Sequence, residues 1–181
     1  MEMIPCRVEE KYPEVCWPES YRISRMPGLS PDSKSFLFRL MHELLPSKER
    51  INHLTPASSP LCWCNTGEVE TYQHLFYGCS KNYEAGQALL RSVQYYDRSL
   101  TGVKSLRVEL GADEPFLLAS ISILSSGLEL IWENRKSKKS TAMYSMGAEL
   151  ELSISIKRRS RLKRIKEAAK IMENMVENFF K

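Results

Sequence analysis

The feature that most constrains this chain is a cluster of metal-binding side chains within residues 61–79, LCWCNTGEVETYQHLFYGC. Cys62, Cys64, His74 and Cys79 fall within eighteen positions of a chain that has five cysteines and three histidines in all. A structural zinc site fills its four tetrahedral positions with Cys and His side chains. The spacing therefore predicts a segment that folds around a Zn²⁺ ion, which would contribute folding free energy.

The local spacing is compatible with a single ion. Gly67 favours a tight turn after the first cysteine pair, and His74 and Cys79 are five positions apart, about one helical turn plus a residue. The sulfurs of Cys62 and Cys64 fit one ion less comfortably than those of the usual pair with two residues between them. The alternative interpretation is that the cysteines are small buried hydrophobes and His74 is an ordinary core or surface histidine.

Composition indicates an intracellular protein. An odd number of cysteines, three of them crowded beside His74, fits reduced thiols better than a secreted disulfide framework. The first residues lack the basic start and apolar core of a signal peptide, and no stretch offers about 18 uninterrupted apolar residues. We therefore expect a nuclear or cytoplasmic protein that is not secreted and does not span a membrane.

Helical periodicity covers most of the remaining chain. Ser30 is a capping residue before a proline, and the apolar positions that follow recur at helical spacing as far as Pro46: Phe36, Leu37, Leu40, Met41 and Leu44. Further helices are expected over 47–54, 82–96 and, capped by Asp113, 116–132. The last of these is apolar around most of its circumference, as in the central helix of a small bundle.

The last third of the chain contains two competing patterns. Residues 149–157 alternate between apolar and polar like a strand, but a lone strand has no partner for its backbone groups, so we interpret them as helix. A short heptad seam follows at Leu162, Ile165, Ala169, Met172, Val176 and Phe179. Docking of this seam onto the core is favoured, and a homo-oligomer formed through it is the alternative.

The sequence thus predicts a mainly α fold. It would be a small helical bundle with a zinc-knuckle-like CCHC insertion and a long basic C-terminal helix. Residues 1–29 would be an irregular lead-in, 30–145 a helical zinc-binding domain, and 146–181 the basic, heptad-spaced helix.

Positive charge is concentrated near the C-terminus. Residues 134–170 hold twelve Lys or Arg and three Glu, a local balance of +9 in a chain of net charge +4. Such segregation favours RNA or DNA as a partner, held by phosphate contacts without base reading. The candidate residues are Lys136, Lys138, Lys139, Lys157, Arg158, Arg159, Arg161, Lys163, Arg164 and Lys166. Alternatives are helix-dipole complementation, a solvated face or a nuclear localisation patch.

Three stretches of the chain resemble a known family. FLFRLMHELLPSKERI (36–51), SPLCWC (59–64) and ETYQHLFYGC (70–79) are similar to the zinc-binding region that follows the polymerase domain in non-LTR (LINE-type) retrotransposon reverse transcriptases. The resemblance covers about residues 35–95, and the basic tail more loosely. It implies zinc held by Cys62, Cys64, His74 and Cys79 and contact with template RNA or target DNA.

Two departures from the family pattern matter. The family's first pair is Cys-x-x-Cys, whereas this chain has Cys62-Trp63-Cys64, so the departure bears on Cys64. The sequence also lacks the paired aspartates of a polymerase. We therefore predict a non-catalytic, zinc-stabilised nucleic-acid-binding module derived from such an element. Alternatives are a structural or oligomerising fragment, an inactive transposon relic, or an endonuclease remnant, for which Asp113 and Glu114 are the one suggestive pair.

Overall fold

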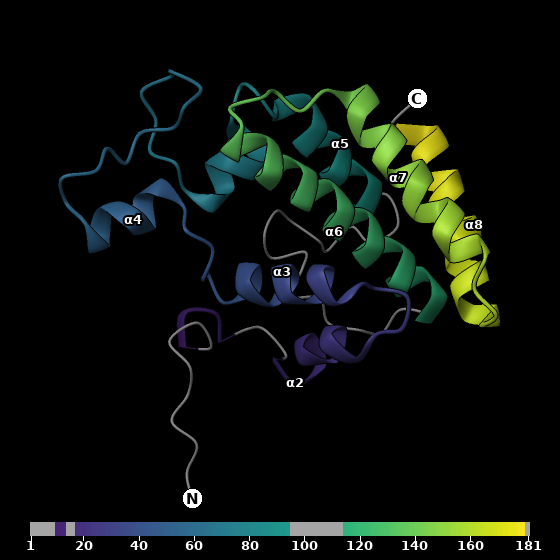
Figure 1. The fold of residues 1–181 in the computed structure, drawn as a ribbon. Coiled ribbons are helices and arrows are strands. Elements are labelled where there is room, and N and C mark those ends of the chain that lie inside the picture. Colours follow the sequence, from purple (N-terminus) through teal and green to yellow (C-terminus); the bar gives the residue numbers. More distant parts are fainter. Residues whose placement is uncertain (1–9, 14–16, 95–113, 180–181) are drawn as a thin grey trace, which may run out of the picture.

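The computed structural model describes residues 10–13, 17–94 and 114–179 (Figure 1). Five helices form a bundle: α3 (Pro31–Met41), α5 (Tyr83–Gln94), α6 (Glu114–Lys136), α7 (Met143–Arg158) and α8 (Lys163–Phe179). The short helix α4 (Lys48–Leu54) and the loop after it lie on the side of the molecule opposite α7 and α8. Within the described residues, the β structure consists of one isolated bridge between Leu61 and Val69. The mainly α prediction is confirmed.

Helix α6 is the centre of the bundle, as predicted. It contacts α3, α5, α7 and α8, and its buried side chains extend from Leu118 to Trp132. Glu114 is its first residue, whereas Asp113, the predicted cap, lies outside the described residues. Tyr96, the last residue of the helix predicted over 82–96, also lies outside them. None of the described helices combines the length and apolar character that a bilayer crossing requires.

Helix α3 begins where predicted but ends earlier. The Ser30 side chain caps it by accepting a hydrogen bond from the Ser33 amide at 3.0 Å. The helix stops at Met41 because Glu43 adopts a left-handed conformation with φ of 54°, and the Leu44 amide bonds back to the Arg39 carbonyl at 2.7 Å. Leu44 is therefore 44 % exposed instead of lying in the core, which corrects the prediction for that residue.

The N-terminal lead-in contains regular structure. Helix α2 (Trp17–Ser20) and the 3₁₀ helix η1 (Tyr21–Arg25) precede α3, and Trp17 is buried. The Tyr21 ring stacks on the ring of His42, with 5.6 Å between centroids. These side chains pack against the end of α3. The prediction of an irregular lead-in is therefore wrong for the described part of residues 1–29.

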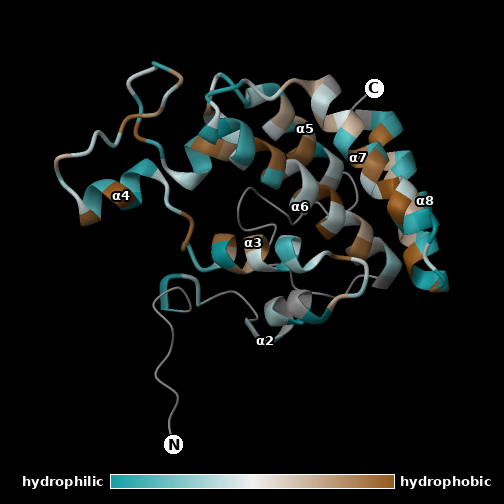
Figure 2. Ribbon diagram, viewed as in Figure 1, coloured by the Kyte–Doolittle hydropathy of each residue, from teal (hydrophilic) through white to brown (hydrophobic). Residues whose placement is uncertain are grey.

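The C-terminal segment forms two helices. Residues 143–158 are helical, which confirms the interpretation of the alternating stretch, and a turn over 159–162 separates α7 from α8. The seam residues Ile165, Ala169, Met172 and Val176 are buried in the main core of the same chain, whereas Leu162 is 47 % exposed. Figure 2 shows the apolar residues of α8 interrupted by hydrophilic ones on its outer side. The seam is therefore docked within the chain.

Candidate metal centre

Cys62 and Cys64 lie on a tight turn that follows α4. The Leu61–Val69 bridge closes the turn, and the Cys62 amide donates to the Glu68 carbonyl at 2.8 Å. The backbone reverses through two left-handed residues, Asn65 with φ of 63° and Gly67 with φ of 79°. Asparagine and glycine adopt this conformation at the lowest cost, so the sequence favours the turn locally.

His74 and Cys79 lie at the two ends of one π-helical turn. Residues His74–Gly78 form this turn, and the Cys79 amide donates to the His74 carbonyl five residues back at 2.5 Å. A π turn accommodates the five-residue spacing that exceeds an α-helical turn. It begins after Thr71, whose hydroxyl accepts from the His74 amide at 3.0 Å.

The two turns bring all four predicted ligands together. The ligand atoms of Cys62, Cys64, His74 and Cys79 lie within 4.8 Å of one another, and all four residues are buried. The Sγ atoms of Cys62 and Cys79 are 3.8 Å apart, and the Cys64 Sγ is 3.4 Å from the His74 Nε2. The group can therefore hold a metal ion, and it includes Cys64 despite the single residue that separates it from Cys62.

The three thiols differ in pKa although burial acts to raise all three values. Burial raises the pKa of Cys62 to about 12, an effect that nearby Cys79 reinforces, and it also raises the pKa of Cys79. At Cys64 burial likewise acts to raise the pKa, but hydrogen bonds from Thr66, His74 and Cys62 outweigh it and lower the pKa to about 6. Cys64 is therefore the thiol that ionises first in the metal-free fold.

Glu68 orients the histidine ligand. Its Oε2 lies 2.5 Å from the His74 Nδ1, on the side of the ring away from the sulfur atoms. A carboxylate on one ring nitrogen fixes the tautomer in which the other nitrogen is free to bind a metal. The sequence analysis did not identify Glu68, because a glutamate in a polar turn carries no distinguishing pattern.

A buried ion pair joins the metal-binding turns to the bundle. Glu70 is completely buried, and its Oε1 accepts from the Arg135 Nε at 2.8 Å and from the Lys48 amide at 3.0 Å. The Arg135 guanidinium also donates to the Pro46 carbonyl at 3.0 Å and lies 4.5 Å from the centroid of the Trp132 ring. Glu70 thereby connects α4, the metal turn and the end of α6. We call residues 47–79, which hold these features, the metal lobe.

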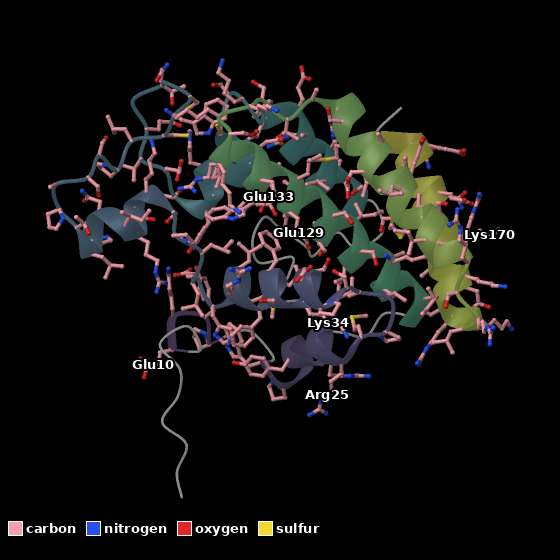
Figure 3. All side chains as sticks on the ribbon, in the orientation of Figure 1. Glu10, Arg25, Lys34, Glu129, Glu133 and Lys170 are labelled. Atoms are coloured by element: carbon pink, nitrogen blue, oxygen red, sulfur yellow. The ribbon has the colours of Figure 1, made fainter. Side chains whose placement is uncertain are left out.

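The first predicted basic group lies where α6 ends. Lys138 and Lys139 are exposed, and neither forms an ion pair with any residue that the structure describes. Lys136 is also exposed but pairs with Glu133 at 2.7 Å (Figure 3 labels Glu133). The group is thus available in part for an external anion.

The second predicted basic group surrounds the α7–α8 turn. Arg158 pairs with Glu173, and Lys163 lies 3.7 Å from Glu167. Apart from Lys157, the remaining members of the group are exposed: Arg159, Arg161, Arg164 and Lys166. Further along α8, Lys170 points outward from the bundle (Figure 3).

Lys157 does not belong to this surface. It is 7 % exposed, and its Nζ donates to the Ser153 hydroxyl at 3.0 Å. Burial lowers its pKa, and the negative charge of Glu129 partly opposes that effect. The prediction that Lys157 contacts phosphate is therefore corrected, because the α7 face that buries Ile154 also carries Lys157 one turn later.

Comparison of the chain with protein-family models, with curated proteins and with solved structures finds no match. The resemblance to reverse transcriptase zinc-binding regions therefore rests on the quoted residues alone.

Proposed function

We propose that the protein is a non-catalytic nucleic-acid-binding module whose metal lobe is stabilised by zinc. The observation that carries the proposal is the buried convergence of four ligand atoms within 4.8 Å, at Cys62, Cys64, His74 and Cys79. Exposed basic residues on the adjoining bundle would supply the contacts to phosphate. The retroelement-like residues of the lobe support a descent from a reverse transcriptase of the LINE type.

The donor set favours zinc over other ions. Thiolates and imidazole suit Zn²⁺, whereas Mg²⁺ and Ca²⁺ prefer oxygen ligands. Two thiolates on a tetrahedral zinc, each about 2.3 Å from the ion, are about 3.8 Å apart. The Cys62 and Cys79 sulfurs have this separation. Four protein ligands also leave no position for a water molecule, which supports a structural role rather than metal-assisted hydrolysis.

Between Lys48 and Val69 the metal lobe has little other means of stabilisation, because the buried side chains there are Cys62 and Cys64, whereas Leu75 and Phe76 join the main core. Its cysteines form a small cluster of their own, with Trp63 packed against it, separate from the main core. Several of its apolar side chains are exposed, among them Leu54 at 77 % and Leu61 at 43 %. A segment with so few buried apolar contacts gains most from a metal, because binding free energy then contributes to folding.

Nucleic acid is the partner that the charge distribution supports. The exposed lysines and arginines flank the two ends of α7, and the chain is basic overall with a net charge of +4. Lys and Arg at phosphates release condensed counterions, so binding should be sequence-tolerant and should weaken steeply with salt.

Metal content tests the first half of the proposal. The purified chain should contain about one zinc per molecule by elemental analysis, and His74→Ala should lose it. His53→Ala is the matched control, since His53 is exposed on α4 and does not belong to the cluster of four ligand residues. A folded wild-type protein without zinc would overturn the proposal.

Binding tests the second half. Fluorescence anisotropy with a labelled single-stranded RNA and a labelled DNA duplex should show affinity that falls linearly with the logarithm of salt concentration. A zinc-loaded protein that binds neither probe at low salt would leave only a structural module.

A further inference from the structure

The end of α6 has an unusual residue in its turn. Lys138 adopts a left-handed conformation with φ of 53°, its amide donates to the Arg135 carbonyl, and the Lys139 amide donates to the Asn134 carbonyl at 2.8 Å. Helices that end in this way usually place glycine at the left-handed position, because a side chain there is strained. Here a lysine takes that position and is exposed.

The turn is joined to the metal lobe's last ligand. The Thr141 amide donates to the Lys81 carbonyl at 3.1 Å, and the Thr141 hydroxyl accepts from the Asn134 side chain at 3.1 Å. Lys81 follows Cys79 by two residues, and the Asn82 amide donates to the Cys79 carbonyl at 2.8 Å. Figure 1 shows the α6–α7 connection passing beside the start of α5, in agreement with the hydrogen bond from Thr141 to Lys81. The backbone of Lys81, two residues after Cys79, thus lies next to the segment that follows Lys138 and Lys139.

The three lysines at this junction carry no internal counter-charge. Lys81, Lys138 and Lys139 are all exposed, and the part of the chain that the structure describes offers none of them an ion pair. Two acids at this end of α6 are already engaged, since Glu70 binds Arg135 and Glu133 binds Lys136. The junction therefore presents positive charge that an external anion can neutralise.

We propose that Lys81, Lys138 and Lys139 form a subsite for successive phosphates of one nucleic-acid strand, beside the metal centre. The subsite rests on the proposed function. It adds the place where the nucleic-acid strand is held, and it adds Lys81, which lies outside the two basic groups predicted from the sequence. The Cys79 carbonyl accepts from the Asn82 amide and so positions Lys81, whose carbonyl in turn accepts from the Thr141 amide. The position of the bound nucleic-acid strand would therefore depend on the metal turn.

The conformation of Lys138 permits a test that separates binding from folding. In the triple variant Lys81→Ala, Lys138→Gly, Lys139→Ala, the glycine relieves the left-handed strain, so the thermal midpoint should not fall. The matched control is Arg25→Ala, Arg91→Ala, Lys170→Ala, which removes the same charge from exposed positions on η1, α5 and α8.

The measurement is the anisotropy titration with single-stranded RNA and duplex DNA over a salt series. The subsite variant should bind about tenfold more weakly near 0.1 M salt, with a slope of log affinity against log salt shallower by about 2, at 0.7 to 0.9 per lost phosphate contact. The control variant should change the slope by less than half of that.

Two contrary outcomes have different meanings. If the wild-type protein binds both probes and the subsite variant equals the control, the subsite is wrong while the proposed function stands. If the zinc-loaded wild-type protein binds neither probe, the proposed function and the subsite fall together.

Discussion

The Oε2 atom of Glu68 lies 2.5 Å from the Nδ1 atom of His74, whose Nε2 faces the Cys64 sulfur at 3.4 Å. The contact fixes both the rotation of the ring and the nitrogen that carries the proton. A surface carboxylate, 64 % exposed, thus determines which histidine nitrogen would face a bound metal ion.

Removal of this contact should weaken metal binding without unfolding the bundle. Glu68→Ala should lower zinc affinity by about tenfold, the lower end of the range for such partners, because solvent can partly replace an exposed carboxylate. Glu68→Gln should keep most of the affinity, since its amide oxygen can still accept from Nδ1. Competition with a chromophoric chelator measures the zinc affinity of both variants. Glu84→Ala is the control, because Glu84 is also exposed. Equal affinities for Glu68→Ala and wild type would contradict a positioning role.

Metal uptake should release about two protons at pH 7. The raised pKa values of Cys62 and Cys79 keep these thiols protonated in the metal-free fold, whereas Cys64, with a pKa of about 6, is already mostly ionised. Between pH 7 and 8 the apparent association constant should therefore rise about 100-fold. Titration calorimetry in buffers of different ionisation enthalpy counts the protons, and a count of zero would refute the ordering of the thiols.

The same pKa values predict how the metal-free fold responds to alkali. Because the folded state binds the Cys62 and Cys79 protons more tightly than the unfolded chain does, this contribution is complete below about pH 8.5. It is lost as the pH rises toward 12. Urea unfolding of the apo protein should show this decline, and Cys62→Ser should reduce it. An apo protein equally stable at about pH 9 and about pH 11, where Cys64 is ionised in both states, would contradict the prediction.

The Glu70–Arg135 pair should be costly to break on one side. Arg135→Met leaves a carboxylate that is completely buried without its counter-charge, and should lower the free energy of unfolding by about 3 to 5 kcal/mol. The double variant with Glu70→Gln should recover part of that loss, because no charge then remains buried. Urea titration measures both. Additive losses in the double variant would show that the two side chains act independently.

Gly86 should tolerate no side chain. A Cβ there would lie 2.0 Å from the Phe76 carbonyl oxygen, in the π turn between two ligands. Gly86→Ala should therefore destabilise the fold by about 3 kcal/mol or more and reduce zinc content. At Gly67 the space is open and only the left-handed strain applies, so Gly67→Ala should cost about 1 kcal/mol. Thermal unfolding compares the two, and similar midpoints would contradict the prediction.

Local sequence signals predicted most of the helices and the group of four side chains, Cys62, Cys64, His74 and Cys79, that the fold brings together. Ser30 and Ser47 mark the true starts of α3 and α4, and helical periodicity gave α6 its central place. The helix ends were less predictable, because α3 and α6 both end at left-handed residues that are not glycine, Glu43 and Lys138. Because no glycine marks the end of α3, the apolar periodicity extended the predicted helix as far as Leu44, whereas the helix ends at Met41.

The supporting residues of the site were missed for a different reason. Glu68 and Glu70 act through partners that become neighbours only in the folded chain, one of them 65 residues away. No spacing rule identifies such a pair. Lys157 could have been assigned to the core side of its helix, because Met146, Leu150 and Ile154 precede it at steps of about one turn and all are buried.

Helix α7 sets a length for the nucleic acid that the proposed function would require. Its 16 residues extend about 24 Å, with Lys138 and Lys139 before its start and Arg159 and Arg161 after its end. A DNA duplex that touches both ends must contain about 7 base pairs, at 3.4 Å each. Oligonucleotides shorter than this reach one end only, so affinity should increase in a single step once the duplex attains that footprint.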